Sequence, residues 1–301
     1  MRGLPNGATL RSTNPVGGGD AIRLEFQGSA GRMVADAWYA PDSLGTVLLL
    51  HGGGQTRHSW QRTGPWLREA GWTAVTIDAR GHGESGWAAN RDYSADALVG
   101  DLLGIIGELR TRPVLVGASM GGNTALLGEG EHPGLARGLV LVDIVPRLEP
   151  TGLMRIREFM RGHPDGFGSL AEVAAAIMDY NPHRTRPPSE AGLLRTVRLG
   201  NDGQWRWHWD PAFLGGGDEP TRAERHERIC AAARALRVPV MLVRGGESDI
   251  VSDDGVGEFL GLVPHARYVN IQAAGHMVAG DDNHVFSAHL LEFLDEVAAT
   301  P

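Results

Sequence analysis

Five short, uninterrupted apolar runs recur along the chain, and each ends in a glycine-rich or polar turn. They cover residues 47–50, 74–77, 114–116, 139–142 and 238–243. Apolar runs without alternation are typical of strands covered on both faces, as in a parallel sheet between helices. Helical patterns separate the runs, most clearly at residues 96–109 after a suitable N-cap, Ser94. The pattern predicts an α/β fold with a mostly parallel, doubly wound sheet, whose reactive groups gather at the carboxyl ends of the strands.

Three segments depart from this strand–helix rhythm. Residues 1–20 are rich in Gly, Pro, Asn and Thr without a hydrophobic period, so we expect a flexible N-terminal arm. Apolar residues at 22–26 and 33–39 flank two glycines and predict a hairpin at the sheet edge. Residues 147–222 show short helical patterns instead of strands. We expect them to form a helical cap inserted into a core of residues 21–146 and 223–301.

The expected cap carries a notable group of aromatic side chains. Trp205, Trp207 and Trp209 alternate within seven residues, and Phe159 follows an apolar helical face. Tryptophans at this density either join the cap to the core or line a substrate pocket. We predict that Phe159, Trp205 or Trp207 line the roof of such a pocket.

Composition narrows the class of protein. A chain of 301 residues with 42% hydrophobic content can bury a large core, and a net charge of −8 without charged blocks gives no footprint for nucleic acid or anionic membrane. We therefore expect a small-molecule substrate as the partner.

The single cysteine, Cys230, excludes a disulfide framework and a cysteine metal cluster, and its helical context suggests a buried filler. No signal-like or membrane-spanning apolar run is present, so we expect a cytoplasmic location. The oligomeric state stays open.

One serine stands in a turn of special shape. Gly117, Ser119 and Gly121 fit Gly-x-Ser-x-Gly directly after the apolar run 114–116. Glycines at these positions let the backbone turn sharply from strand to helix and expose the hydroxyl above the strand end. The motif is short enough to arise by chance, so its weight depends on the residues around it.

The surrounding motifs make the chain resemble the α/β-hydrolase fold superfamily, in its cap-bearing branch. The resemblance covers about residues 20–300 and rests on five motifs in family order, each after an expected strand. They are His51-Gly-Gly-Gly54, Asp78-Ala-Arg-Gly-His-Gly-Glu-Ser85, Gly117-Ala-Ser-Met-Gly121, Gly246-Glu-Ser-Asp249 and Ala274-Gly-His276-Met277. The family implies about eight strands, an inserted cap and ester hydrolysis on a Ser-Asp-His triad.

The resemblance also implies roles for individual residues. Ser119 is the nucleophile, and His276 is the base that removes its proton. Asp249 is the expected acid that orients the histidine, although relatives sometimes place this acid one strand earlier, where this chain has Asp143. The backbone N–H groups of Gly53 and Met120 are the expected oxyanion hole. We expect Arg80, His82 and Ser85 to brace the neighbouring loop.

Other activities fit the same residues less well. A serine rather than an aspartate at position 119 disfavours epoxide hydrolysis and dehalogenation. A carbon–carbon bond hydrolase, a cofactor-free perhydrolase or a haloperoxidase could use the same triad, although Met277 replaces the tryptophan common in carbon–carbon bond hydrolases. A ligand-binding protein without turnover is the alternative of another class. We expect no cofactor and no metal, since His51, His58 and His82 lack ligand spacing.

Overall fold

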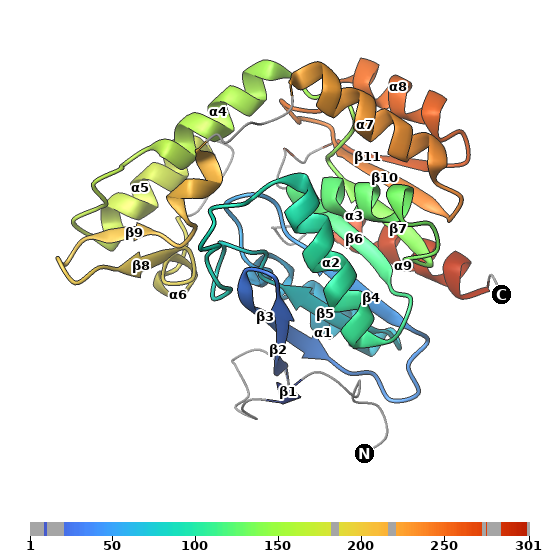
Figure 1. Ribbon diagram of the computed structural model, residues 1–301, viewed down its shortest axis with the longest axis horizontal. Coiled ribbons are helices and arrows are strands. Elements are labelled where there is room, and N and C mark those ends of the chain that lie inside the picture. Colours follow the sequence, from blue (N-terminus) through green and yellow to red (C-terminus); the bar gives the residue numbers. More distant parts are fainter. Residues whose placement is uncertain are drawn as a thin grey trace.

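A twisted, nine-stranded sheet runs through the computed structural model, which describes residues 9–10, 21–181, 187–215, 221–272, 275 and 284–299 (Figure 1). The strand order is β1-β2-β3-β5-β4-β6-β7-β10-β11. Strands from β5 to β11 pair in parallel, whereas β1, β2 and β3 are antiparallel at one edge. The predicted α/β fold with a mostly parallel sheet is therefore confirmed. The strand bounds are β1 (Thr9–Leu10), β2 (Ile22–Gly28), β3 (Gly31–Trp38), β4 (Thr46–Leu50), β5 (Thr73–Ile77), β6 (Val114–Ala118), β7 (Gly138–Val142), β10 (Val240–Gly245) and β11 (Arg267–Ile271).

Helices cover both faces of this sheet and explain why its central strands lack polar alternation. In β4, Leu48 packs with α2, α3, α7 and α8 on one face, whereas Leu49 packs with α1 and α9 on the other. Both leucines are fully buried. Successive side chains of a strand point to opposite faces, so a strand covered on both sides must be apolar at every position. The core helices and one 3-10 turn are η1 (Arg57–Trp60), α1 (Thr63–Glu69), α2 (Ala95–Leu109), α3 (Met120–Glu131), α7 (Arg222–Ala235), α8 (Asp253–Leu262) and α9 (His284–Ala299).

The segment between β7 and α7 forms a separate layer beside the sheet (Figure 1). It has its own apolar core, which includes Met160, Phe167, Val173 and Trp209. Its elements are α4 (Pro150–Arg161), α5 (Leu170–Tyr180), α6 (Glu190–Leu193), β8 (Val197–Leu199), β9 (Trp205–Trp207) and the 3-10 turn η2 (Pro211–Leu214). We call residues 147–222 the cap segment. The expectation of helices alone was incomplete, because the alternating tryptophans lie on β9, which pairs with β8 in an antiparallel hairpin.

Other sequence expectations can be compared directly with the described residues. Helix α2 begins after Ser94, whose side chain accepts a hydrogen bond from the Ala97 N–H, as a cap should. Thr9–Leu10 pairs with β2, so part of the expected arm is an edge strand. Strand β11 was not among the predicted runs, because polar residues interrupt its apolar ones. Among the described residues, no helix combines the length and apolarity needed to cross a bilayer.

Candidate active site

Ser119 occupies a strained turn between β6 and α3. Its φ is 47° and its ψ is −110°, a combination that residues with a Cβ rarely adopt. Two backbone hydrogen bonds hold it there: Ser119 N–H donates to Val142 O at 3.0 Å, and Asn123 N–H donates to Ser119 O at 2.9 Å. The serine is only half-buried. Such strain is maintained only where the surrounding structure fixes it, and it often marks a functional position.

The glycines of the motif are required by close backbone packing. A Cβ at Gly117 would lie 2.5 Å from the carbonyl carbon of Gly121, and a Cβ at Gly121 would lie 2.5 Å from Leu50 O. Both contacts involve backbone atoms, which cannot move aside as a flexible side chain could. The tight turn therefore depends on glycine at both positions, as the motif predicts.

The two expected oxyanion donors lie close to Ser119. Met120 is the first residue of α3, so its N–H comes before the helical hydrogen-bond ladder begins. In the loop after β4, a Cβ at Gly52 would lie 3.5 Å from the Cβ of Ser119. The neighbouring N–H groups of Gly52 and Gly54 are bonded to Gln55 Oε1 and His82 Nε2. The Gly53 N–H donates no hydrogen bond within the part of the chain that the structure describes.

His51 joins the loop after β4 to the loop after β5. Its Nδ1–H donates to Gly52 O at 2.7 Å, and its Nε2 accepts from Ala79 N–H at 3.0 Å. One ring nitrogen donates and the other accepts, which describes a neutral imidazole with a defined tautomer. The ring is fully enclosed and holds the backbone of both loops.

Two further histidines hold Gly54 from both sides. Nε2 of His82 accepts from Gly54 N–H at 3.1 Å, while its Nδ1–H donates to Arg80 O. Nε2–H of His208 donates to Gly54 O at 3.2 Å, while its Nδ1 accepts from Gly83 N–H. His208 follows β9, so the cap segment is bonded directly to the expected oxyanion loop. No local sequence pattern predicts this contact, which spans 154 positions.

Burial keeps these three histidines neutral. It lowers the pKa of His51 to about 4 and that of His82 to about 3. Burial also lowers the pKa of His208 well below its usual value, and the neighbouring rings of His82 and His51 add to the effect. None of the three is suited to act as a base near neutral pH, because each ring already uses both nitrogens for backbone hydrogen bonds.

The loop after β5 is braced by buried ion pairs, as expected for Arg80 and Ser85. Arg80 donates to both oxygens of Asp101 on α2, at 2.6 and 2.7 Å. Ser85 accepts from Val34 N–H and donates to Asp78 O. The other brace is the Arg57 guanidinium, which is almost fully buried and paired with Asp36, Asp78 and Glu84.

The two candidate acids have different surroundings. Asp143 directly follows β7, is fully buried and has φ of 51°. Its Oδ1 accepts from Gly245 N–H at 3.1 Å and its Oδ2 from Ser248 Oγ at 2.6 Å. Asp249 lies in the turn after β10, where its side chain is 42% exposed and its Oδ2 lies 2.9 Å from Nη1 of Arg155. His276, the expected base, lies outside the described residues.

The cap residues nearest to the expected oxyanion loop are not the ones that the sequence indicated. Ring carbons of Phe213, in η2, would lie 3.5 Å from a Cβ at Gly53. A Cβ at Gly54 would meet Met160 and Trp209 at 3.0 and 3.4 Å. Met160 and Phe213 were not predicted as roof residues, because nothing in their local sequence reports a contact with a loop more than 100 positions away. Trp209 belongs to the tryptophan group noted in the sequence, although it was not among the three predicted roof residues.

The three predicted roof residues make contacts with other residues of the cap segment. Phe159 stacks on Tyr180, with ring centroids 4.2 Å apart. Trp207 is buried and stacks on Trp209, while Trp205 exchanges backbone hydrogen bonds with Phe167. Their role at a substrate pocket remains a prediction.

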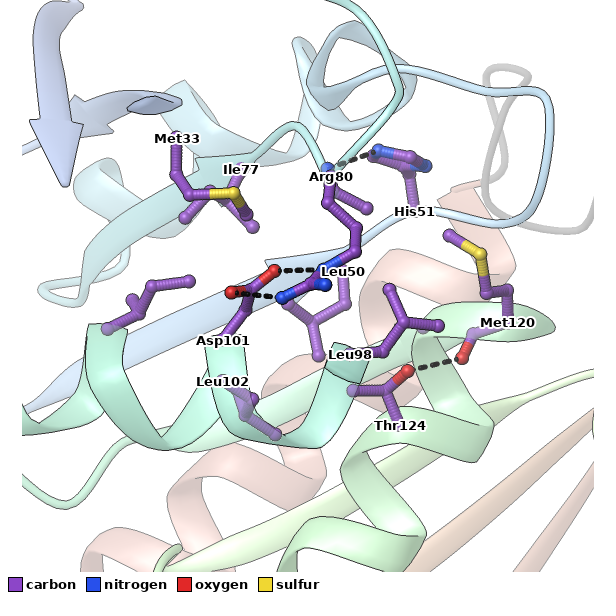
Figure 2. Close-up of a pocket in the computed structure, with 13 residues that line it drawn as sticks. Met33, Leu50, His51, Ile77, Arg80, Leu98, Asp101, Leu102, Met120 and Thr124 are labelled. Atoms are coloured by element: carbon purple, nitrogen blue, oxygen red, sulfur yellow. Dashed lines mark hydrogen bonds and ion pairs between the residues drawn. The ribbon is translucent and has the colours of Figure 1, made fainter. Parts of the chain in front are cut away.

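An apolar pocket lies beside the turn between β6 and α3, on the side of α2 (Figure 2). The paired side chains of Arg80 and Asp101 border it, and Thr124 Oγ1 donates to Met120 O at 2.9 Å. Apolar side chains from β3, β4, β5, α2 and α3 form most of its wall: Met33, Leu50, Ile77, Leu98, Leu102, Ile105 and Met120.

Comparisons with known proteins find relatives over most of the chain. The family model described as alpha/beta hydrolase fold matches residues 45–283. The esterase Rv0045c of Mycobacterium tuberculosis is 31% identical over 246 residues, which are 78% of each chain. The 3-hydroxybutyrate-oligomer hydrolase of Cupriavidus necator is 27% identical over 261 residues, or 81% of this chain and 87% of the relative.

Solved structures give the same result for the fold. A structure of the Mycobacterium tuberculosis esterase Rv0045c, described in connection with transition metal inhibition, superposes with a TM-score of 0.72 and 29% identity. It covers 93% of this chain and 94% of its own. E-2-(acetamidomethylene)succinate hydrolase superposes with a TM-score of 0.78 at 22% identity, over 91% of this chain and 99% of its own. The second likeness concerns the fold alone.

Proposed function

Because the chain belongs to the alpha/beta hydrolase fold family, we propose that it hydrolyses a small-molecule carboxylic ester or lactone through an acyl-enzyme intermediate on Ser119. One observation carries the proposal. Ser119 is held at φ 47° at the start of α3, beside a glycine loop that approaches its Cβ. This arrangement offers a nucleophile and two backbone donors to one carbonyl group. The names of the relatives, an esterase and an oligoester hydrolase, support ester chemistry.

The reaction follows from the chemistry of these groups. Ser119 Oγ attacks the ester carbonyl while His276 takes its proton, and the negative charge moves to the carbonyl oxygen. The N–H groups of Gly53 and Met120 stabilise that oxygen. The alcohol leaves with the proton from His276, and water then hydrolyses the acyl-serine by the same steps.

For the acid we favour Asp143 over Asp249. Asp143 is fully buried at the end of β7, and β7 pairs with β6, the strand that leads to Ser119. Hydrogen bonds from Gly245 and Ser248 stabilise its ionised form. Asp249 is partly exposed and paired with Arg155 of α4, which suits a contact between cap and core. An acid that orients a histidine works best where solvent does not compete for it.

The surroundings of Ser119 support an apolar substrate. The pocket beside Met120 has a mostly aliphatic wall, and the arginine and aspartate at its border are bonded to each other. On the other side, Phe213 covers the Gly53 loop. Burial of methylene groups against such walls stabilises the bound ester by roughly 0.8 kcal/mol each. We therefore propose an ester with an apolar acyl or alcohol group.

The direct test replaces Ser119 by alanine and measures steady-state hydrolysis of p-nitrophenyl esters of increasing acyl length. We expect the rate to fall by at least about 1,000-fold with unchanged folding, because only the oxyanion hole would remain. Ser94→Ala is the matched control, since it removes an exposed helix-capping hydroxyl that takes no part in the proposed reaction. A Ser119→Ala enzyme with nearly normal turnover would refute the nucleophile. A wild-type chain that binds esters without turnover would indicate a binding protein.

A further inference from the structure

Three potential metal ligands meet where α7 packs against α8. His226 and Cys230 lie one helical turn apart on α7, so their side chains lie on the same face of that helix. Glu258 comes from α8, the neighbouring helix in Figure 1. The ligand atoms of these three residues all lie within 4.8 Å of one another.

We propose that His226, Cys230 and Glu258 bind one divalent transition-metal ion of the Zn²⁺ class. The geometry is close to what the ion requires. Tetrahedral zinc with ordinary bond lengths holds its sulfur about 3.5 Å from the nitrogen and oxygen ligands, and those two about 3.3 Å apart. Here Cys230 Sγ lies 3.6 Å from His226 Nε2 and 4.0 Å from Glu258 Oε1. His226 Nε2 lies 2.9 Å from Glu258 Oε1. Shifts of a few tenths of an ångström would admit the ion.

The kind of ligand selects the kind of metal. Thiolate and imidazole ligands favour Zn²⁺ and Co²⁺ over Mg²⁺ and Ca²⁺, which prefer oxygen alone. Three protein ligands leave a fourth position for water. The thiol is buried, but the side chains of His226 and Glu258 are 38% and 28% exposed. The ion can therefore enter from the solvent side.

Glu258 also keeps capacity for an ion. Its Oε2 is buried and accepts no hydrogen bond within the part of the chain described by the structure. The Nε of Arg147 lies 3.8 Å from this oxygen, and Arg147 also contacts Asp254. Arg147 is the first residue of the cap segment. The proposed ion would therefore lie where the cap segment joins the core.

Binding must displace a proton from the thiol. A metal of this class binds the thiolate, so coordination breaks the S–H bond of Cys230 and releases its proton to the solvent. His226 coordinates through Nε2 and keeps the proton on Nδ1. Binding therefore strengthens as the pH rises.

The sequence alone could not locate this site. The spacing of His226 and Cys230 is visible, but two ligands on one helix are too few to indicate a metal. Glu258 follows 28 positions after Cys230 and becomes a partner only because α7 and α8 pack together. The expectation that Cys230 is only a buried filler did not consider this contact.

The test titrates the metal-free full-length protein with Co²⁺ and records the thiolate-to-cobalt charge-transfer absorption. Cys230 is the sole cysteine, so such a band can come from no other residue. We expect one equivalent to saturate the band and release about one proton per ion. Cys230→Ser should abolish the band, and His226→Gln and Glu258→Gln should each weaken binding by about 10-fold or more.

Two controls separate this site from the catalytic one. His132→Gln changes an exposed histidine at the end of α3, and His276→Ala removes the proposed catalytic base. Both should keep the band and the affinity, whatever happens to ester hydrolysis. The proposal is overturned if the wild type shows no band, or if His226→Gln and Glu258→Gln bind Co²⁺ as tightly as the wild type. Circular dichroism of the metal-free variants verifies that each one folds.

Discussion

Two residues at neighbouring strand ends adopt backbone conformations that cost energy. Ser119 and Asp143 have φ of 47° and 51°, and both directly follow paired strands of the parallel sheet. Positive φ in a residue with a Cβ costs of the order of 1 kcal/mol or more, so packing must hold both in place. The strain at Ser119 presents its hydroxyl, and the strain at Asp143 turns a buried carboxylate toward Gly245 and Ser248.

We expect the two candidate acids to respond differently to removal of charge. Asp143→Asn should lower kcat by about 10,000-fold, because an amide in place of the acid favours the wrong histidine tautomer. Asp249→Asn should change the free energy of unfolding by about 1 kcal/mol or less, as an exposed ion pair does, and leave kcat nearly unchanged. Ester hydrolysis and urea denaturation of both variants check this.

Ser248→Ala adds a control for Asp143, because it removes one hydrogen bond from the carboxylate and keeps the charge. Its kcat should fall far less than that of Asp143→Asn. If Asp249→Asn instead loses turnover while Asp143→Asn loses only stability, the acid is Asp249, as the sequence motif indicated.

Residue-level prediction was strongest where chemistry forces a local motif. The glycines around Ser119 can be read from the sequence because a sharp strand-to-helix turn tolerates no Cβ there. The acid was ambiguous because Asp143 and Asp249 both follow strands, and the sequence does not reveal which is buried. The contact of Phe213 with the Gly53 loop depends on how the cap segment packs, which no local pattern reports.

At the scale of elements, the cap segment is bonded to the core after β9 and before α4. Asp210 N–H donates to Gly81 O at 2.8 Å, and Tyr93 Oη donates to the Asp210 carboxylate. At the other end, Glu149 N–H donates to Ile250 O at 3.0 Å. Strand–helix alternation in the sequence stops after residues 139–142, which is the basis for expecting a cap there. It could not predict the β8–β9 hairpin, whose strands are only three residues long.

This attachment predicts which aromatic side chains select the substrate. Phe213→Ala should raise KM for long-chain esters by about tenfold and shift the preferred acyl length, because its ring covers the Gly53 loop. Trp205→Ala is a matched control within the same layer, on β9. Both variants should still react with a small organophosphate, which needs only the nucleophile and the oxyanion hole.

The comparison also tests the roof predicted from the sequence. If Trp205→Ala, Trp207→Ala or Phe159→Ala shifts the preference while Phe213→Ala does not, those residues line the pocket instead. In that case the cap segment must close further over Ser119 when substrate binds.

For the whole molecule, buried neutral histidines should make stability depend on pH. Burial lowers the pKa of His51 and His58 to about 4 and that of His82 to about 3, and it lowers the pKa of His208 well below its usual value. The unfolded chain protonates these groups near pH 6.5. Below that pH the unfolded state binds more protons, so stability is complete above about pH 6.5 and decreases as the pH falls toward 4.

The expected size of this effect follows from the same shifts. At pH 5.5 each of the four histidines contributes about 1.4 kcal/mol to stabilisation of the unfolded state, or roughly 5 kcal/mol together. Burial raises the pKa of Asp36, which opposes the trend, but one carboxyl group cannot offset four imidazoles. The pKa of Glu84 is lowered to about 2 in the folded chain. A lowered carboxyl pKa reduces the stability of the fold mainly below the unfolded value, which is near 4.5 for Glu84. The interval between pH 6.5 and 5 therefore reports on the histidines.

Urea denaturation at pH 7.5, 6.5 and 5.5 measures this dependence. We expect the free energy of unfolding to decrease by several kcal/mol over that range, with a slope of about four protons near pH 5.5. His132→Gln, an exposed position, should reproduce the wild-type slope, whereas His82→Gln should reduce it by about one proton. A flat profile would mean that the folded chain protonates these rings. The bonds that His82 accepts from Gly54 N–H and that His208 accepts from Gly83 N–H would then have to break. Since Gly54 adjoins the proposed oxyanion donor Gly53, a folded chain that protonates His82 would also distort the oxyanion loop.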